Sequence, residues 1–184
     1  MNKRNAFFIT LTSAILVTLP TTVFSHITLI DKHAKAGDTI KNALQIGHGC
    51  TNWNGKSLAT QRVIMLVPDG VKQARAFAKA GWKIKMIKGP ITPYESRGTM
   101  ITEDVVKIIW TADGNNNKLD SDLRGEFYFR ATMPEKAAQS IYFPSTQVCN
   151  AKNMVEWTGI PMTDQEPGDL DRPAPRLVTT PSGL

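Results

Sequence analysis

Short runs of β-branched and aromatic residues, separated by turn-forming residues about every 8 to 15 positions, most constrain the fold of this chain. In one such run, residues 125–132, Phe127 and Phe129 alternate with polar neighbours, which predicts a strand that buries both phenylalanines and turns Glu126 to the opposite face. Almost no segment has the 3.6-residue period of an amphipathic helix. The pattern predicts an all-β chain folded as a two-sheet antiparallel β-sandwich.

Strand and turn signals divide the chain further. We expect strands at residues 27–29, 39–46, 61–67, 82–88, 103–111, 125–132, 140–149 and 153–160. Residues 71–80 are ambiguous, because their Ala, Lys, Arg and Gln favour a helix, while the segment is short and ends at Gly81, so a strand followed by a turn is an equal alternative. A loop is expected from Gly89 to Gly98, because Pro90 and Pro93 are turn signals.

The first 25 residues have the organisation of a secretory signal peptide. Lys3 and Arg4 form a positive start, residues 6–19 an apolar core, and residues 20–25 a polar exit that ends in Ser25. The apolar core has about 14 residues, whereas a membrane-spanning helix needs about 20. We therefore expect residues 1–25 to be cleaved and the protein to be exported, as a periplasmic or secreted protein.

The charge of the chain after the predicted leader does not indicate a nucleic-acid-binding surface. The whole sequence has 22 Lys and Arg against 16 Asp and Glu, and the predicted leader removes two of the basic residues. No basic cluster is interleaved with aromatic residues, so we expect no nucleic-acid partner. No second apolar run follows the leader, which predicts a form without a membrane anchor.

The mature chain is long enough for one domain with a sizeable core. We expect a β-sandwich over residues 26–163 and a tail over residues 164–184. The tail is rich in Pro, Asp and Glu, so it is expected to lie over the surface or to be disordered.

Cys50 and Cys149 are the only cysteines. An even, small number of cysteines in an exported chain indicates a disulfide bond. The alternative is a copper or redox site built from two thiolates, but the pair lacks the CxxC spacing of such sites.

The first residue after the predicted cleavage is His26. An N-terminal histidine offers its free α-amine and its ring Nδ1 to one metal ion, and the two nitrogens close a six-membered chelate. Amine and imidazole nitrogens in a tetragonal arrangement suit Cu(II). The alternative is that His26 is simply the first residue and binds nothing.

Several short motifs resemble one family in combination and in order. They are His26-Ile27-Thr28-Leu29, Ala36-Gly37-Asp38, His48-Gly49-Cys50, Gly81-Trp82-Lys83, Pro93-Tyr94, Gly125-Glu126-Phe127, Phe129-Arg130, Tyr142-Phe143-Pro144, Cys149, and Trp157 before Ile160-Pro161. Together they resemble the YcnI-like copper-binding proteins over nearly the whole mature chain.

This resemblance implies a cupredoxin-like or immunoglobulin-like sandwich that binds one Cu(II) through a single-histidine brace. Carried over by motif, the amine and Nδ1 of His26 chelate the ion and Glu126 contributes a carboxylate oxygen. Trp157 lies beside the ion without bonding to it. Without the resemblance, Glu126 is a surface carboxylate and Trp157 a core aromatic residue.

The chain also departs from the family pattern. Gly125 stands where relatives often have Asp, Ser96-Arg97-Gly98 where some have His-Gly, and His33 where an acidic residue is common. The surroundings of the ion are therefore expected to differ, and the roles of His33, His48 and Arg97 stay open.

The resemblance favours a copper chaperone or buffer over an enzyme, with another periplasmic copper protein or a membrane copper importer as partner. One alternative is a histidine-brace copper oxidase or monooxygenase, which needs a second histidine, either His33 or His48. Another is an extracytoplasmic interaction domain without metal, for which the strand pattern alone suffices.

Overall fold

The computed structural model describes residues 26–182, so the predicted signal peptide, residues 1–25, lies outside the described residues. Regular structure within residues 26–182 consists of strands and two short 3-10 turns, η1 (Asn115–Asn117) and η2 (Pro167–Asp169). In this range no helix is long and apolar enough to span a bilayer. The predicted all-β class is confirmed.

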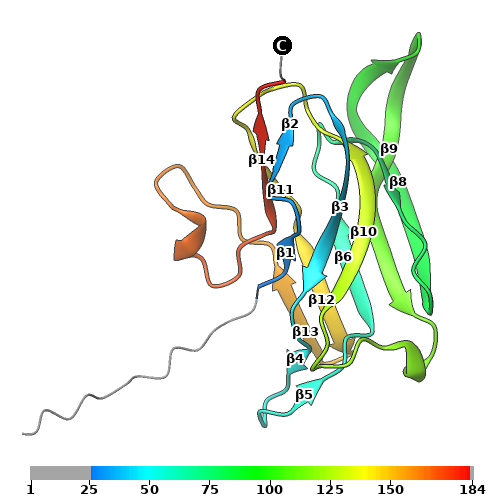
Figure 1. The fold of residues 1–184 in the computed structure, drawn as a ribbon, viewed down its shortest axis with the longest axis vertical. Helices are drawn as coiled ribbons and strands as arrows, with labels where there is room; N and C mark the ends of the chain where they lie inside the picture. The colour runs from blue at the N-terminus through cyan, green and yellow to red at the C-terminus, as the bar shows by residue number, and fades with distance from the viewer. Residues whose placement is uncertain (1–25, 183–184) are drawn as a thin grey trace, which may run out of the picture.

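Two antiparallel sheets form the sandwich (Figure 1). One sheet has the strand order β1 (Thr28–Leu29), β3 (Thr39–Ile46), β10 (Gly125–Thr132) and β7 (Lys72–Ala76). The other has the order β13 (Asn153–Trp157), β12 (Ser145–Asn150), β6 (Arg62–Leu66), β9 (Thr99–Ala112) and β8 (Trp82–Ser96). The predicted two-sheet antiparallel sandwich is therefore confirmed.

Aromatic side chains fill the space between the sheets. Phe127 and Phe129 on β10 are fully buried, as their alternation predicted. Phe127 packs edge-on against Trp110, with ring centroids 5.7 Å apart, and Phe129 packs against Phe143 at 5.5 Å. Glu126 lies on the outer face of β10 and is half-buried, so the predicted orientation of this strand is confirmed.

The ambiguous segment 71–80 forms the strand β7, which pairs with β10 at the edge of its sheet. Ala74 is buried while its neighbours Gln73 and Arg75 are exposed. Pairing with β10 gives one side of the β7 backbone its hydrogen-bond partners and buries Ala74. These tertiary gains outweigh the helix propensity of the segment.

The loop predicted from Gly89 to Gly98 is wrong. Strand β8 continues through both prolines to Ser96 and pairs with β9 in a long hairpin, with register shifts next to Lys88 and between Pro90 and Tyr94. This is possible because β8 is an edge strand, where one row of backbone groups needs no partner and proline is tolerated.

A third sheet has the order β11 (Ser140–Tyr142), β14 (Arg176–Thr180) and β2 (His33–Lys35), with β14 parallel to β2. The prediction that residues 164–184 form a surface or disordered tail is therefore wrong for β14. Leu177 is fully buried and Thr179 is 1% exposed. The burial of alternate side chains and two partner strands hold this segment in the fold.

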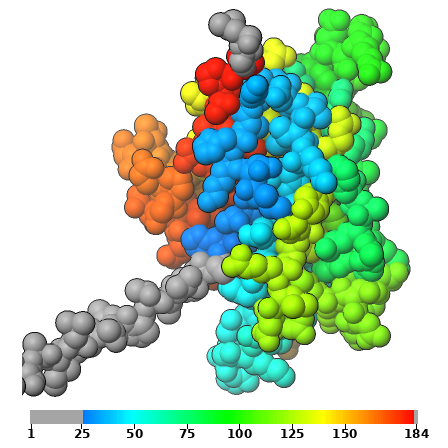
Figure 2. All heavy atoms as spheres, in the orientation of Figure 1, coloured from blue at the N-terminus to red at the C-terminus, as the bar shows by residue number. Residues whose placement is uncertain are grey.

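Between β13 and β14 the chain makes an excursion over residues 158–175, which we name the 158–175 loop. Figure 2 shows part of it as an orange lobe that stands out from the body of the protein, next to the strands at the start of the described chain. A small hairpin, β4 (Cys50–Thr51) and β5 (Ser57–Leu58), lies at one end of the sandwich (Figure 1).

Candidate functional site

His26 and Trp157 lie against each other at an edge of the sandwich. Their ring centroids are 5.1 Å apart and their planes are tilted by 57°. His26 lies two residues before the start of β1, and Trp157 is the last residue of β13. Strands β1 and β13 are each an edge strand, one in either sheet. The contact therefore spans the two layers where both sheets end.

The position of His26 follows from the burial of its neighbours. Ile27 and Leu29 are 3% and 2% exposed, and they hold β1 in the core. Because side chains alternate along an extended chain, His26 and Thr28 then turn away from the interior. Thr28 pairs with Gln45 in the antiparallel ladder of β1 and β3, so His26, two residues ahead of Thr28, is held close to this edge of the sheet.

Trp157, like the core residue Trp110, has a buried indole N–H without a hydrogen-bond partner among residues 26–182. The indole of Trp157 is 4% exposed. A buried N–H without an acceptor is disfavoured by about 1–3 kcal/mol.

Two cavities flank His26. One, of about 410 Å³, is lined by His26 and His33 together with β1 and the base of the 158–175 loop. The other, of about 680 Å³, brings residues from four separate parts of the chain around His26. They include His48, Cys50, Gln147, Val155, Trp157, Leu170, Asp171 and Arg172.

The 158–175 loop forms a wall of both cavities because its base is closed beside Trp157. The N–H of Gly159 donates to the carbonyl of Arg172 at 3.0 Å, and the N–H of Ala174 donates to the carbonyl of Gly159 at 2.8 Å. These bonds bring Asp171 and Arg172 to the cavity that holds His26. Sequence reasoning missed both residues, since no local pattern in this loop indicates that it returns to the start of the mature chain.

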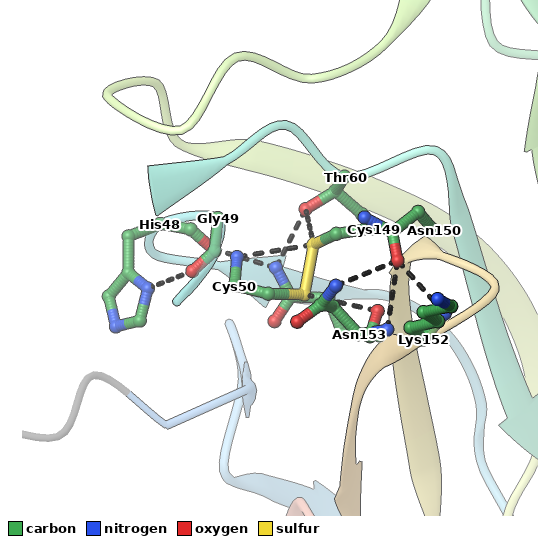
Figure 3. The surroundings of a disulfide bond; sticks show 9 residues. His48, Gly49, Cys50, Thr60, Cys149, Asn150, Lys152 and Asn153 are labelled. Carbon is green, nitrogen blue, oxygen red and sulfur yellow. Dashed lines mark hydrogen bonds between the residues drawn. A yellow bond between two sulfur atoms is a disulfide. The ribbon is translucent and has the colours of Figure 1, made fainter. Parts of the chain in front are cut away.

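The disulfide predicted between Cys50 and Cys149 is confirmed and lies beside the same cavity (Figure 3). It joins β4 to β12, with the two Cα atoms 6.1 Å apart. Next to it, the main-chain carbonyl of His48 accepts a hydrogen bond from Gln147 Nε2 at 2.7 Å. The hydrogen bond at His48 and the disulfide at Cys50 together hold the segment that carries His48.

Glu126 lines neither cavity beside His26. It lies opposite Gln45, which is itself opposite Thr28, so two strand spacings, about 10 Å, separate it from β1. Its carboxylate accepts a hydrogen bond from the hydroxyl of Tyr128, which raises the pKa of that tyrosine. Lys79 is nearby, and its partial burial lowers its pKa against the opposing attraction of Glu126.

The two remaining residues with open roles lie in different places. His33 is exposed on β2 and lines the smaller cavity beside His26. Arg97 lies in the turn between β8 and β9 and lines neither cavity beside His26. The tip of that hairpin projects beyond the rest of the sandwich (Figure 1).

Within residues 26–182, no three side chains of His, Cys, Asp or Glu gather closely enough to hold a metal ion by themselves. The site predicted from the sequence has a different donor set, because one N-terminal histidine supplies two nitrogens. The structure brings together His26 and Trp157, adds His48 and Asp171 to the same cavity, and keeps Glu126 apart. The use of any of these groups as copper ligands stays a prediction.

Comparison with known proteins gives a family and a fold. A family model described as a domain of unknown function, DUF1775, matches residues 26–179. No curated protein matches the chain. The chain is also similar to an uncharacterized protein from Nocardia farcinica, whose crystal structure is described as an immunoglobulin-like fold. The TM-score is 0.62 and the sequence identity 20%, over 84% of this chain and 98% of that one.

A protein from Corynebacterium diphtheriae, described as a candidate membrane anchored protein, is also similar. The TM-score is 0.37 and the identity 9%, over 86% of this chain and 35% of that one. The likeness to the Nocardia farcinica protein supports the immunoglobulin-like form of the predicted sandwich.

Proposed function

The chain belongs to the DUF1775 family, and on this premise we propose that it is an exported protein that holds one Cu(II) ion at His26. Cleavage after Ser25 frees the α-amine of His26, and this amine and ring Nδ1 then chelate the ion. The copper is cargo, which the protein buffers or passes to another periplasmic copper protein or a membrane copper importer. In this proposal the protein is a chaperone and not an enzyme.

The contact between His26 and Trp157 carries the proposal. An imidazole whose centroid is 5.1 Å from an indole centroid puts a metal bound at Nδ1 close to an aromatic ring. Such a ring attracts cationic charge and restricts solvent at the ion. The family match supports His26 as the first residue of the mature protein, because His26 is the first residue that the family model matches.

The remaining donor in the proposal is the carboxylate of Glu126, which the resemblance to YcnI-like proteins implies. Glu126 lies farther from His26 than Trp157 does. Glu126 is bonded to Tyr128 and lines neither cavity beside His26, so it reaches the ion only if its side chain leaves Tyr128 and the N-terminus moves toward β3 after cleavage.

The test compares the protein that starts at His26 with a version that has one Ala ahead of it. The extension turns the amine into an amide and removes one of the two chelating nitrogens, so Cu(II) affinity should collapse while the melting temperature of the metal-free protein stays unchanged. Affinity of the protein that starts at His26 should rise from pH 6 to pH 8, because the amine has an unperturbed pKa of about 8 and must lose its proton to bind.

Competition with a chromophoric copper chelator measures both effects. A protein starting at His26 that binds no copper overturns the proposed function. Equally tight binding in the extended version overturns the chelate at the terminus.

A further inference from the structure

We propose that His48 is a second imidazole ligand of the copper ion held at His26. This inference rests on the proposed function, because it adds a donor to the same site. It departs from the single-histidine brace that the resemblance implies. Its grounds are the cavity that both histidines line, the hydrogen bond of the His48 ring and the rigid backbone around that residue.

The two histidines line one cavity although they are far apart along the chain. Both line the cavity of about 680 Å³ that also contains Trp157. Figure 3 shows the imidazole of His48 directed away from the disulfide, toward the side on which the chain leading into β1 begins. His26 is the residue that begins this segment, and its own ring faces Trp157.

The ring of His48 has one nitrogen engaged and one available. Its Nδ1 is bonded to the carbonyl oxygen of Gly49. A carbonyl oxygen only accepts, so Nδ1 carries the hydrogen, and in the neutral ring the lone pair is on Nε2. Histidines that bind metals usually donate their other ring N–H to a carbonyl or carboxylate in this way, which sets the tautomer and the ring orientation.

The backbone that carries His48 is held from several directions. Gln147 Nε2 donates to the carbonyl of His48 at 2.7 Å, and the N–H of Gly49 donates to the carbonyl of Ser121 at 3.1 Å. A Cβ atom on Gly49 would come within 2.0 Å of the carbonyl oxygen of Leu58. Close packing there leaves room only for glycine, so the histidine before it presents its ring from a fixed support.

The combined donor set suits Cu(II). The amine and Nδ1 of His26 with Nε2 of His48 make three nitrogens, and nitrogen donors in a tetragonal arrangement are those that Cu(II) prefers. His33, by contrast, is exposed on β2 and lines only the cavity on the other side of His26. It is therefore the matched control.

The test uses the protein that starts at His26 and the variants His48→Asn and His33→Asn. Asn keeps an N–H donor for the Gly49 carbonyl but has no counterpart of Nε2. Cu(II) affinity is measured by chelator competition, and X-ray absorption of the loaded proteins counts the imidazole rings on copper. We expect His48→Asn to weaken binding at least about tenfold and His33→Asn to change it by less than about twofold.

X-ray absorption of the unsubstituted protein gives an answer that needs no variant. Two imidazoles on copper support the inference, and His48→Asn should reduce the number to one. If the unsubstituted protein binds copper through one imidazole, or if His48→Asn binds as tightly, then His48 is not a ligand although the proposed function stands. If the unsubstituted protein binds no copper, the proposed function and this inference both fail.

Discussion

The substitution Asp104→Asn should destabilise the fold, because the carboxylate of Asp104 ties β9 to β7 and β8. The side chain is only 8% exposed. It accepts hydrogen bonds from the N–H of Gln73 at 2.6 Å, the N–H of Val105 at 2.7 Å and the hydroxyl of Tyr94 at 2.9 Å. Arg75 Nη1 lies 3.7 Å from the same carboxylate.

The expected loss follows from how the two oxygens are used. Oδ1 accepts from Val105, and Oδ2 accepts from Gln73 and Tyr94. Asn keeps one oxygen, so its amide N–H₂ group faces at least one backbone N–H that then has no acceptor, at a cost of about 1–3 kcal/mol. The remaining bonds lose the assistance of charge, worth about 1 kcal/mol more. The ion pair adds little, since Arg75 is 47% exposed.

We therefore expect Asp104→Asn to lower the free energy of unfolding by about 2–4 kcal/mol at pH 7. The difference should depend on pH. Burial favours the neutral acid, but the three hydrogen bonds and Arg75 outweigh it and lower the pKa of Asp104 in the folded protein. Because the pKa of Asp104 is lower in the folded protein than in the unfolded chain, where it is about 3.9, the ionised carboxylate stabilises the fold at pH values above about 3.9. This stabilisation is lost as the pH falls through the pKa of the folded protein.

Urea unfolding followed by tryptophan fluorescence, at pH 7 and at steps below pH 4, measures both effects. Asp113→Asn is the matched control, because its carboxylate pairs with Lys83 at 2.7 Å but is 55% exposed. That substitution should cost less than about 1 kcal/mol. A loss below about 1 kcal/mol for Asp104→Asn, or a difference that does not shrink in acid, would refute this account of the network.

Two further predictions concern the proposed copper site. Glu126→Gln should weaken copper binding without changing the melting temperature of the metal-free protein, since Glu126 is on the outer face of β10. Unchanged copper affinity would mean that Glu126 is not a ligand and only accepts the hydrogen bond from Tyr128. Trp157→Phe should keep most of the affinity, because cation–π attraction is worth about 0.5–2 kcal/mol, but should remove most of the fluorescence quenching by one equivalent of Cu(II). Quenching that persists undiminished would assign the ion to a neighbourhood other than that of Trp157.

Local sequence patterns were enough to predict the class of fold and the orientation of its strands. Alternation at Phe127 and Phe129 predicted both the strand and its buried face, because side chains of an extended chain alternate whatever strands lie beside it. Cys50 and Cys149 were paired correctly, since two cysteines allow only one intramolecular bridge. These features depend on adjacent residues or on a count, so no tertiary contact was needed to find them.

Pairing between distant segments decided what the local patterns could not. Strand β8 continues through Pro90 because it is at an edge, and β14 joins the fold because β2 and β11 offer it backbone partners. The candidate site has the same origin. His26, His48 and Trp157 line one cavity, while Glu126 lies two strands away from β1. Strand order and the closure of the 158–175 loop set which side chains become neighbours. Both depend on hydrogen bonds between residues far apart in sequence.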